Sequence, residues 1–150
     1  METFDFGSGA VPAHRHKNHD GFIGGWVANT ASVAKTAIVG IDARVFGNAQ
    51  ISDKAKLFGY AQVFGSAQVF GKAQVYGSAR VYGEAWILDN AQVFGDACVS
   101  GHARITNSAQ VSGEAQVSGN TRLFGNAKMT GDTKISDALP VCPVQSILGW

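Results

Sequence analysis

Aliphatic side chains recur at every sixth position through most of the chain. The series runs from Val27 to Ile135 without an insertion. Its members are Val27, Val33, Val39, Val45, Ile51, Leu57, Val63, Val69, Val75, Val81, Ile87, Val93, Val99, Ile105, Val111, Val117, Leu123, Met129 and Ile135. A fixed short period of this kind is typical of a solenoid, in which each repeat packs only against its neighbours.

Two further columns accompany the aliphatic series. Two residues before each aliphatic position, from 31 to 133, the residue is Ala except at Thr121 and Thr133. Two residues after it, from Gly47 to Asp137, every residue is Gly, Asp or Asn. Because side chains alternate along a strand, the Ala and the aliphatic residue share one side of a short strand. Gly, Asn and Asp tolerate positive φ, which indicates a tight corner after each strand.

Strands and corners in alternation predict a coil. If one hexad forms one side, three successive hexads close a triangular coil. The pattern then accounts for about six coils, or roughly 30 Å of stacked height at about 4.8 Å per rung. The hydrophobic pattern therefore predicts an all-β fold with a narrow interior of Ala and aliphatic side chains.

The repeat A-x-V-x-G-x is clearest at residues 61–85, AQVFGSAQVFGKAQVYGSARVYGEA. It resembles the hexapeptide-repeat family, whose fold is a left-handed parallel β-helix. The resemblance covers residues 26–137, and the near-perfect repeats are most similar to uncharacterised bacterial and prophage proteins. It implies a left-handed parallel β-helix that assembles as a homotrimer. One such scaffold hosts several functions, so the resemblance leaves the function open.

The two ends of the chain do not follow the repeat. Residues 1–25, rich in Gly and His, are expected to form an irregular N-terminal leader that covers the first coil. Residues 138–150 are apolar and contain Pro140 and Pro143, which interrupt strand pairing. We expect this segment either to cap the last coil, whose edge would otherwise invite aggregation, or to dock on a neighbouring chain.

The composition mainly excludes classes of function. The net charge is +1 and there is no run of like charges, so neither nucleic-acid binding nor an electrostatic membrane anchor is expected. No stretch reaches the roughly 20 apolar residues of a membrane span. Cys98 and Cys142 lie far apart and match no metal or redox spacing. We expect a soluble cytoplasmic protein.

Aromatic residues occupy the position after the aliphatic residue in the middle coils. Residues three hexads apart form one row of Phe46, Phe64 and Tyr82 and a second row of Phe58, Tyr76 and Phe94. Two such rows could supply on the order of several hundred Å² of apolar surface, which monomers rarely expose. We interpret the rows as a protein interface, with self-association first. Ladders of rings that stack on one another, and stacking on sugar rings, are the alternatives.

His102 is the only histidine within the repeats and the one candidate for catalysis. A hexapeptide-repeat acyltransferase, by resemblance, uses a histidine as general base on an acceptor hydroxyl. Such enzymes also carry an extruded loop around the acyl carrier, which this array lacks. A carbonic anhydrase of this fold needs three histidines from two adjacent chains. An acyltransferase using His102 is therefore an alternative, and we assign no catalytic residue.

The N-terminal segment contains a histidine cluster, AHRHKNH, with His14, His16 and His19. In an extended segment His14 and His16 would point the same way. Two or three imidazoles can hold Zn²⁺ or Fe, and three chains meeting on an axis could supply six nitrogens. The motif is similar to the His-x-His iron site at the tip of phage membrane-piercing spikes. A metal-tipped phage structural protein using His14 and His16 is a second alternative.

Together these patterns favour a non-catalytic, self-associating β-helical scaffold or protein-binding protein of bacterial or phage origin. It would act through the outward aromatic rows, as a homo-oligomer and with a host protein as a further partner. No cofactor is expected apart from Zn or Fe at the histidine cluster.

Overall fold

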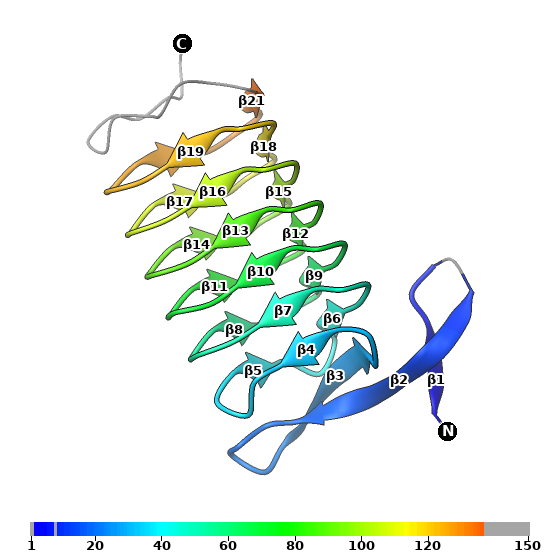
Figure 1. Cartoon of the computed structure of the whole chain (residues 1–150). Helices are drawn as coiled ribbons and strands as arrows, with labels where there is room; N and C mark the ends of the chain where they lie inside the picture. Colours follow the sequence, from blue (N-terminus) through cyan, green and yellow to red (C-terminus); the bar gives the residue numbers. More distant parts are fainter. Residues whose placement is uncertain (1, 8, 137–150) are drawn as a thin grey trace.

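The computed structural model describes residues 2–7 and 9–136, and Figure 1 shows its strands. The segment 138–150, for which we expect a cap or a docking tail, lies outside the described residues. The described residues form strands and no helix. From β3 onward the strands wind into a parallel β-solenoid of about six coils. The predicted all-β solenoid is confirmed. No helix long and apolar enough to cross a membrane occurs in the part of the chain that is described.

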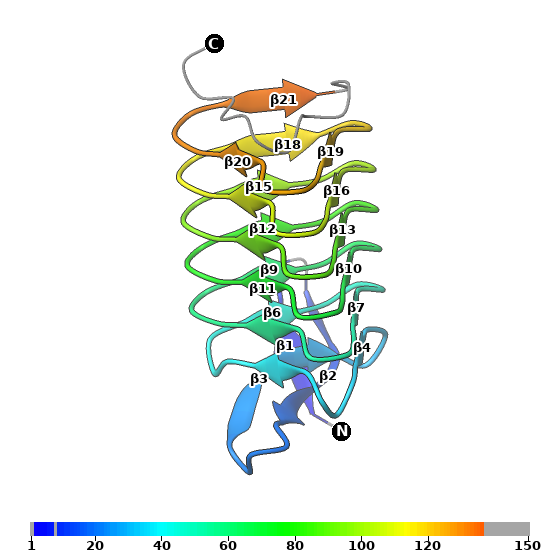
Figure 2. The same ribbon diagram turned by 90° about the vertical axis from the view of Figure 1, so that its left-hand side faces the viewer.

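Each coil contributes one strand to each of three sheets, and Figure 2 shows the coils stacked along the axis. The first sheet has nine strands: β1 (Thr3–Asp5), β2 (Ala10–Lys17), β3 (Ile23–Ala28), β6 (Arg44–Val45), β9 (Gln62–Val63), β12 (Arg80–Val81), β15 (Cys98–Val99), β18 (Gln116–Ser118) and β21 (Lys134–Ser136). The second has six: β4 (Ser32–Val33), β7 (Gln50–Ile51), β10 (Gln68–Val69), β13 (Trp86–Ile87), β16 (Arg104–Ile105) and β19 (Arg122–Leu123). The third also has six: β5 (Ile38–Val39), β8 (Lys56–Leu57), β11 (Gln74–Val75), β14 (Gln92–Val93), β17 (Gln110–Val111) and β20 (Lys128–Met129).

Strands of neighbouring coils pair in parallel, each with the strand three hexads away along the chain. Val63 of β9 lies beside Val45 of β6 on one side and beside Val81 of β12 on the other. The aliphatic and Ala columns face inward, and from Val39 to Met129 they are at most 1% exposed. Each coil thus completes the backbone hydrogen bonds of the coil before it and buries its inward side chains.

From Gly47 onward, a positive φ at the end of each side turns the chain onto the next sheet. Most of these corners are Gly: Gly65 has a φ of 68°, and a Cβ there would lie 2.9 Å from the backbone nitrogen of Gly83 in the next coil. Three corners carry a side chain at positive φ instead: Asp53, Asp89 and Asn107. Asp53 Oδ2, for example, accepts a hydrogen bond from the backbone N–H of Gly71 at 3.0 Å. Such bonds explain why Asp and Asn replace Gly in this column.

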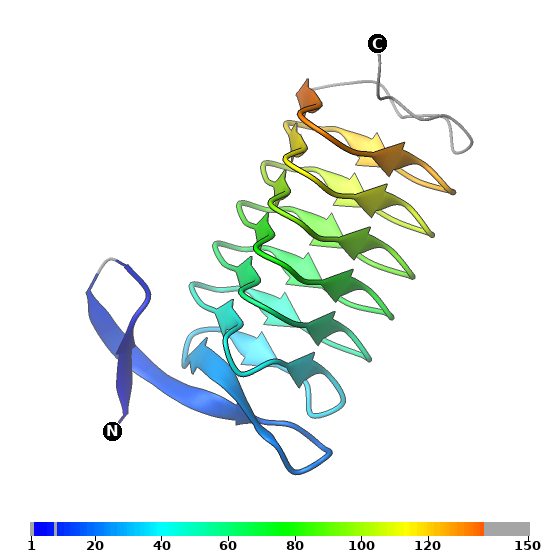
Figure 3. The ribbon, with the colours of Figure 1, turned by 180° about the vertical axis from the view of Figure 1, so that it is seen from behind.

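The N-terminal segment differs from the irregular leader expected for residues 1–25. Strands β1 and β2 form an antiparallel hairpin, and β2 pairs antiparallel with β3, so the segment extends the first sheet (Figures 1 and 3). Asp5 stabilises the hairpin turn because its Oδ1 accepts hydrogen bonds from the N–H groups of Gly7 and Gly9. The expectation missed the hairpin because antiparallel pairing across a turn has no six-residue period.

This segment also covers the open edge of the third sheet. Gly24 packs so closely on the first coil that a Cβ there would overlap the carbonyl oxygen of Val39. The Asn18 side chain donates to the Val39 carbonyl at 3.1 Å and accepts from the Val39 N–H at 2.9 Å. His16 Nε2 lies 3.2 Å from the carbonyl oxygen of Ala37. The two side chains replace hydrogen bonds that a preceding strand would make to β5.

Candidate interaction surface

The first aromatic row lies along the outer face of the first sheet as a continuous stack. The ring centroids of Phe46 and Phe64 are 4.7 Å apart with 3° between the planes, and those of Phe64 and Tyr82 are 5.0 Å apart at 4°. Phe6 of the hairpin continues the stack onto Phe46 at 4.7 Å. The rings are half-buried. Because the rings cover one another's faces, this row leaves mainly ring edges for a partner.

The second row lies on the third sheet and is interrupted. Tyr76 and Phe94 stack with centroids 4.9 Å apart, and the Tyr76 hydroxyl donates to Gln92 Oε1 at 3.4 Å. Phe58 stacks on no other ring of the described residues and is 40% exposed. Of the six residues predicted as an interface, Phe58 therefore presents the most surface to solvent.

Two large apolar residues outside the predicted rows lie close to Phe58 at the corner between the third and first sheets. Ile41 is 62% exposed and Tyr60 is 66% exposed. Other coils place only Gly at the position of Ile41, and Ser, Asp or Glu at the position of Tyr60. We call Ile41, Phe58 and Tyr60 the apolar corner. The sequence does indicate this patch, because Ile41 and Tyr60 are bulky side chains in two corner columns that otherwise contain small or polar residues.

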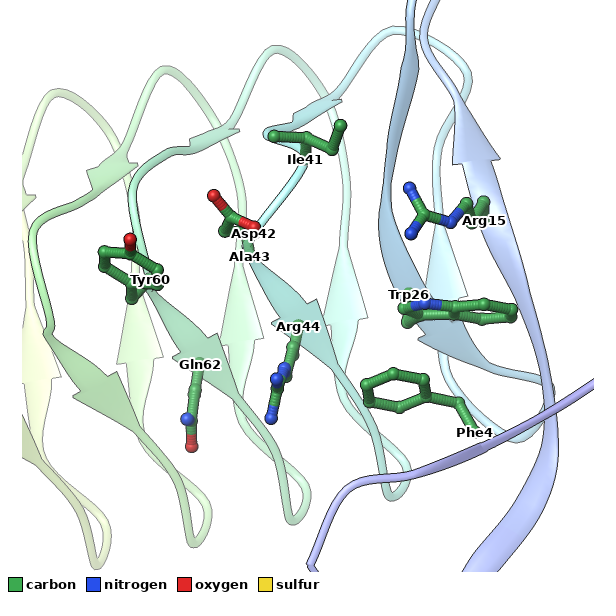
Figure 4. Close-up of a pocket in the computed structure, with 9 residues that line it drawn as sticks. All are labelled: Phe4, Arg15, Trp26, Ile41, Asp42, Ala43, Arg44, Tyr60 and Gln62. Atoms are coloured by element: carbon green, nitrogen blue, oxygen red, sulfur yellow. The ribbon is translucent and has the colours of Figure 1, made fainter.

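The apolar corner borders a groove of about 270 Å³ between the N-terminal hairpin and the parallel strands of the first sheet (Figure 4). The residues that line it are Phe4, Arg15, Trp26, Ile41, Asp42, Ala43, Arg44, Tyr60 and Gln62. Four of these side chains form a layered stack, in the order Arg15, Trp26, Phe4 and Arg44. Successive separations are 5.2 Å from guanidinium to ring, 5.0 Å between rings and 5.1 Å from ring to guanidinium. These cation–π contacts hold both arginines at the groove.

The groove presents the positive charges and N–H donors of two arginines, whereas the faces of its stacked rings are covered. Trp26 and Phe4 cover each other, and each also has a guanidinium over its ring. Neither Arg15 nor Arg44 forms an ion pair with any residue that the structure describes, and Asp42 lines the groove without pairing to either. The arrangement can therefore accept an anionic group.

The corner that carries Tyr60 is acidic in the later coils. Asp96, Glu114 and Asp132, which we call the acidic column, occupy the same position in three successive coils. The backbone N–H of Asp96 donates to Gly113 at 2.7 Å and that of Glu114 donates to Gly131 at 2.9 Å, so the corners stack directly. The hydrogen bond that the protonated Glu114 carboxyl donates to Asp132, together with the negative charges of Asp132 and Asp96, raises the pKa of Glu114. The column therefore concentrates negative charge on one corner.

His102 lies at the corner between the first and second sheets, away from the groove. Its Nδ1 is 3.2 Å from Glu84 Oε2 in the preceding coil, and the two side chains are 64% and 65% exposed. A carboxylate beside a histidine can orient a general base. The groove of Figure 4 does not include His102. An acyltransferase role for His102 stays a prediction.

The three histidines of the N-terminal segment differ in their surroundings. His14 is exposed and its Nδ1 lies 2.8 Å from Asn29 Oδ1, His16 is buried against the first coil, and His19 is exposed in the turn after β2. The pairing of β2 with β3 shifts next to His16, which breaks the alternation expected of an extended strand. Within residues 2–7 and 9–136, no group of three His, Cys, Asp or Glu side chains could hold a metal ion. A Zn or Fe site shared by several chains stays a prediction.

The buried His16 is expected to make stability depend on pH. Burial lowers the pKa of His16 below its usual value of 6.5; the hydrogen bond to Ala37 opposes this shift and the charge of His14 adds to it. Because the folded pKa lies below the unfolded one, the contribution is complete above about pH 6.5 and is lost as the pH falls through the folded pKa. We expect His16→Gln to flatten this part of the pH profile in urea unfolding, whereas His14→Gln, which removes only the smallest of the three contributions, keeps most of it. Identical profiles for His16→Gln and wild type would contradict the assignment.

The family described as the YdcK β-solenoid repeat matches the chain at residues 73–89 and 99–113, in the coils from β11 to β17. No curated protein and no solved structure matches the chain significantly. The matched residues lie within the six-residue repeat, and they form parallel coils of the solenoid described above. The architecture and the similarity agree that this chain is a β-solenoid repeat protein.

Proposed function

We propose that this protein is a non-catalytic scaffold that binds another protein chain, a second copy of itself first, through the apolar corner. The proposal is carried by the exposure of Ile41, Phe58 and Tyr60, which are 40–66% exposed on one corner of the solenoid. Large apolar side chains gathered on a surface typically mark an interaction site. Burying their exposed parts would contribute on the order of a few kcal/mol at about 25 cal/mol per Å².

The interior of the solenoid supports a function on the outer surface. From Val39 to Met129 the inward aliphatic and Ala side chains fill the described coils and are at most 1% exposed. A partner must therefore contact the outer faces and corners. Among these, the stacked row of Phe46, Phe64 and Tyr82 is partly satisfied by its own ring contacts. The homotrimer implied by the family resemblance, and a host protein as a further partner, remain predictions.

Phe58→Ser combined with Tyr60→Ser is expected to lower the oligomer mass in light scattering. The β-type circular dichroism should stay unchanged, because neither ring belongs to the buried core. The matched control is Phe64→Ser with Tyr82→Ser, which removes two stacked, half-buried rings from the adjacent sheet. This control should lower thermal stability and keep the wild-type mass. A wild-type protein that is monomeric at about 100 μM, or a Phe58/Tyr60 variant of unchanged mass, would overturn the proposal.

A further inference from the structure

Opposite charges without partners lie at the two ends of one corner of the solenoid. One column of this corner reads Asp42, Tyr60, Ser78, Asp96, Glu114 and Asp132, with one residue per coil. Beside its N-terminal end the groove holds Arg15 and Arg44, and at its C-terminal end stands the acidic column. Neither set has an ion-pair partner among the residues that the structure describes.

The two arginines of the groove are preorganised by contacts within the chain. Figure 4 shows Arg15 and Arg44 at the two ends of the Trp26–Phe4 pair. Guanidinium groups held over rings lose less side-chain entropy when they pair with a carboxylate, and their planar N–H donors match a carboxylate's two oxygens. Asp42 supplies one negative charge in the groove, so the two arginines leave it with a positive excess.

The acidic end has the opposite character. The carboxylates of Asp96, Glu114 and Asp132 follow one another on successive coils. The hydrogen bond of Glu114 to Asp132 and the neighbouring negative charges raise the pKa of Glu114. Their mutual repulsion disfavours the charged form of the column within one chain. Guanidinium groups from another molecule would relieve this repulsion.

We propose that a second copy of this chain binds along this corner in antiparallel orientation, so that the acidic column of each copy faces the Arg15–Arg44 groove of the other. The inference rests on the proposed self-association and specifies its surface and orientation. Charge complementarity identifies the occupant, since one chain carries both halves of the contact.

The order of residues along the column fits a two-fold axis. An axis perpendicular to the solenoid between Ser78 and Asp96 places Tyr60 opposite Glu114, with the groove opposite Asp132. Every contact then occurs twice, as a two-fold interface requires. The hydroxyl of Tyr60 can donate to the carboxylate of Glu114 across this interface.

The parallel alternative places like charges together. If two copies met along this corner in parallel, the acidic columns would face each other and so would the arginines, which is unfavourable at short range. Near the two-fold axis the corner carries Gly77, Ser78, Gly95 and Asp96, and Asp96 of each copy lies opposite Ser78 of the other. The three small residues let the two backbones approach. The bulky apolar corner lies to one side of this centre, where it can pack beside the charged contact.

The test reverses the charge at each end and then combines the variants. The acid-end variant is Glu114→Lys with Asp132→Lys, both at exposed corner positions where folding should not suffer. The groove-end variant is Arg15→Glu with Arg44→Glu. Sedimentation velocity of the full chain at about 50 mM salt should show a wild-type dimer that dissociates at about 500 mM salt. Each variant alone should raise the dimer dissociation constant at least about tenfold, which corresponds to about 1.4 kcal/mol.

An equal mixture of the two variants should form dimers again, because both contacts of the mixed dimer join opposite charges. Restoration by mixing also excludes misfolding of either variant as the cause of the loss. A wild-type mass of three chains, or a mixture that stays monomeric, would overturn the antiparallel pairing.

Two further outcomes separate this inference from the proposed function. If the acid-end variant keeps the wild-type mass while Phe58→Ser with Tyr60→Ser dissociates, self-association through the apolar corner stands and the antiparallel pairing fails. A wild-type monomer would contradict both. If that monomer bound a polyglutamate peptide in a manner abolished by the groove-end variant, the groove would take a different acidic chain, and the second-copy proposal would be overturned.

Discussion

Leu57→Ala is expected to lower the free energy of unfolding by about 2–5 kcal/mol. Leu57 is fully buried and lies between Val39 and Val75 of the neighbouring coils. The interior at this level is built from small side chains on rigid stacked strands, so little can move to fill the space of the missing methyl groups. The loss should appear as a lower midpoint in urea unfolding followed by far-UV circular dichroism.

Lys54→Ala is the matched control for this effect. Lys54 lies three residues earlier in the same coil, at an exposed corner. Its replacement should change the unfolding free energy by less than about 0.5 kcal/mol. If Leu57→Ala cost no more than this control, the coils would have to collapse around the cavity, and the interior could not be as rigid as its strand stacking indicates.

Gly65→Val is expected to lower the free energy of unfolding by about 2–4 kcal/mol. The loss arises at a corner of the coil and not in the hydrophobic core. Gly65 has a φ of 68°, which a β-branched residue adopts only with strain. A Cβ at this position would also lie 2.9 Å from the backbone nitrogen of Gly83, so the stacking of two coils must shift. Thermal unfolding would record the loss as a lower melting temperature.

Gly65→Asn separates the two causes, since it adds the same Cβ. Asn already occupies this column at Asn107, where φ is 55° and the side-chain oxygen accepts the N–H of Gly125 at 3.0 Å. We expect Gly65→Asn to cost at least about 1 kcal/mol less than Gly65→Val. Equal losses would mean that the close approach to Gly83 decides the effect and that the φ angle contributes little.

The coils could be predicted because the repeat determines which residues become neighbours. In a solenoid of constant period, the residues beside Val63 are those three hexads before and after it, Val45 and Val81. The inward columns are nearly invariant in type, so a slip of fewer than six residues would place a polar side chain or a corner glycine in the interior. Few alternative pairings compete with the observed one.

The N-terminal hairpin could not be predicted in this way. The pairing of β1 with β2 depends on one turn, where Asp5 accepts two backbone hydrogen bonds. The contacts of Phe4 with Trp26 and of Phe6 with Phe46 depend on where the hairpin comes to lie. No spacing in the sequence sets that placement, and so the groove between hairpin and sheet was not foreseen.

The candidate surface was predicted in part. The register of both aromatic rows is as the three-hexad spacing requires, but the spacing alone does not tell which rings cover each other. Phe58 follows Gly40 in its row, so it has no ring before it to cover its face. Ile41 and Tyr60 depart from the residue types of their corner columns. These two columns lie outside the aromatic rows, so the rows alone do not predict the apolar corner.

The six-residue repeat has a consequence for how such a protein can change during evolution. Because one hexad is one side of a coil, the gain or loss of a single hexad keeps the inward columns and the corners in order. It nevertheless moves every later strand to the next sheet. After loss of one hexad between Phe46 and Phe64, Phe70 would follow Phe46 on the first sheet, and every outward row beyond it would be recombined. A lineage can therefore rearrange the outer surface one hexad at a time while the interior is inherited intact, and only steps of three hexads preserve both.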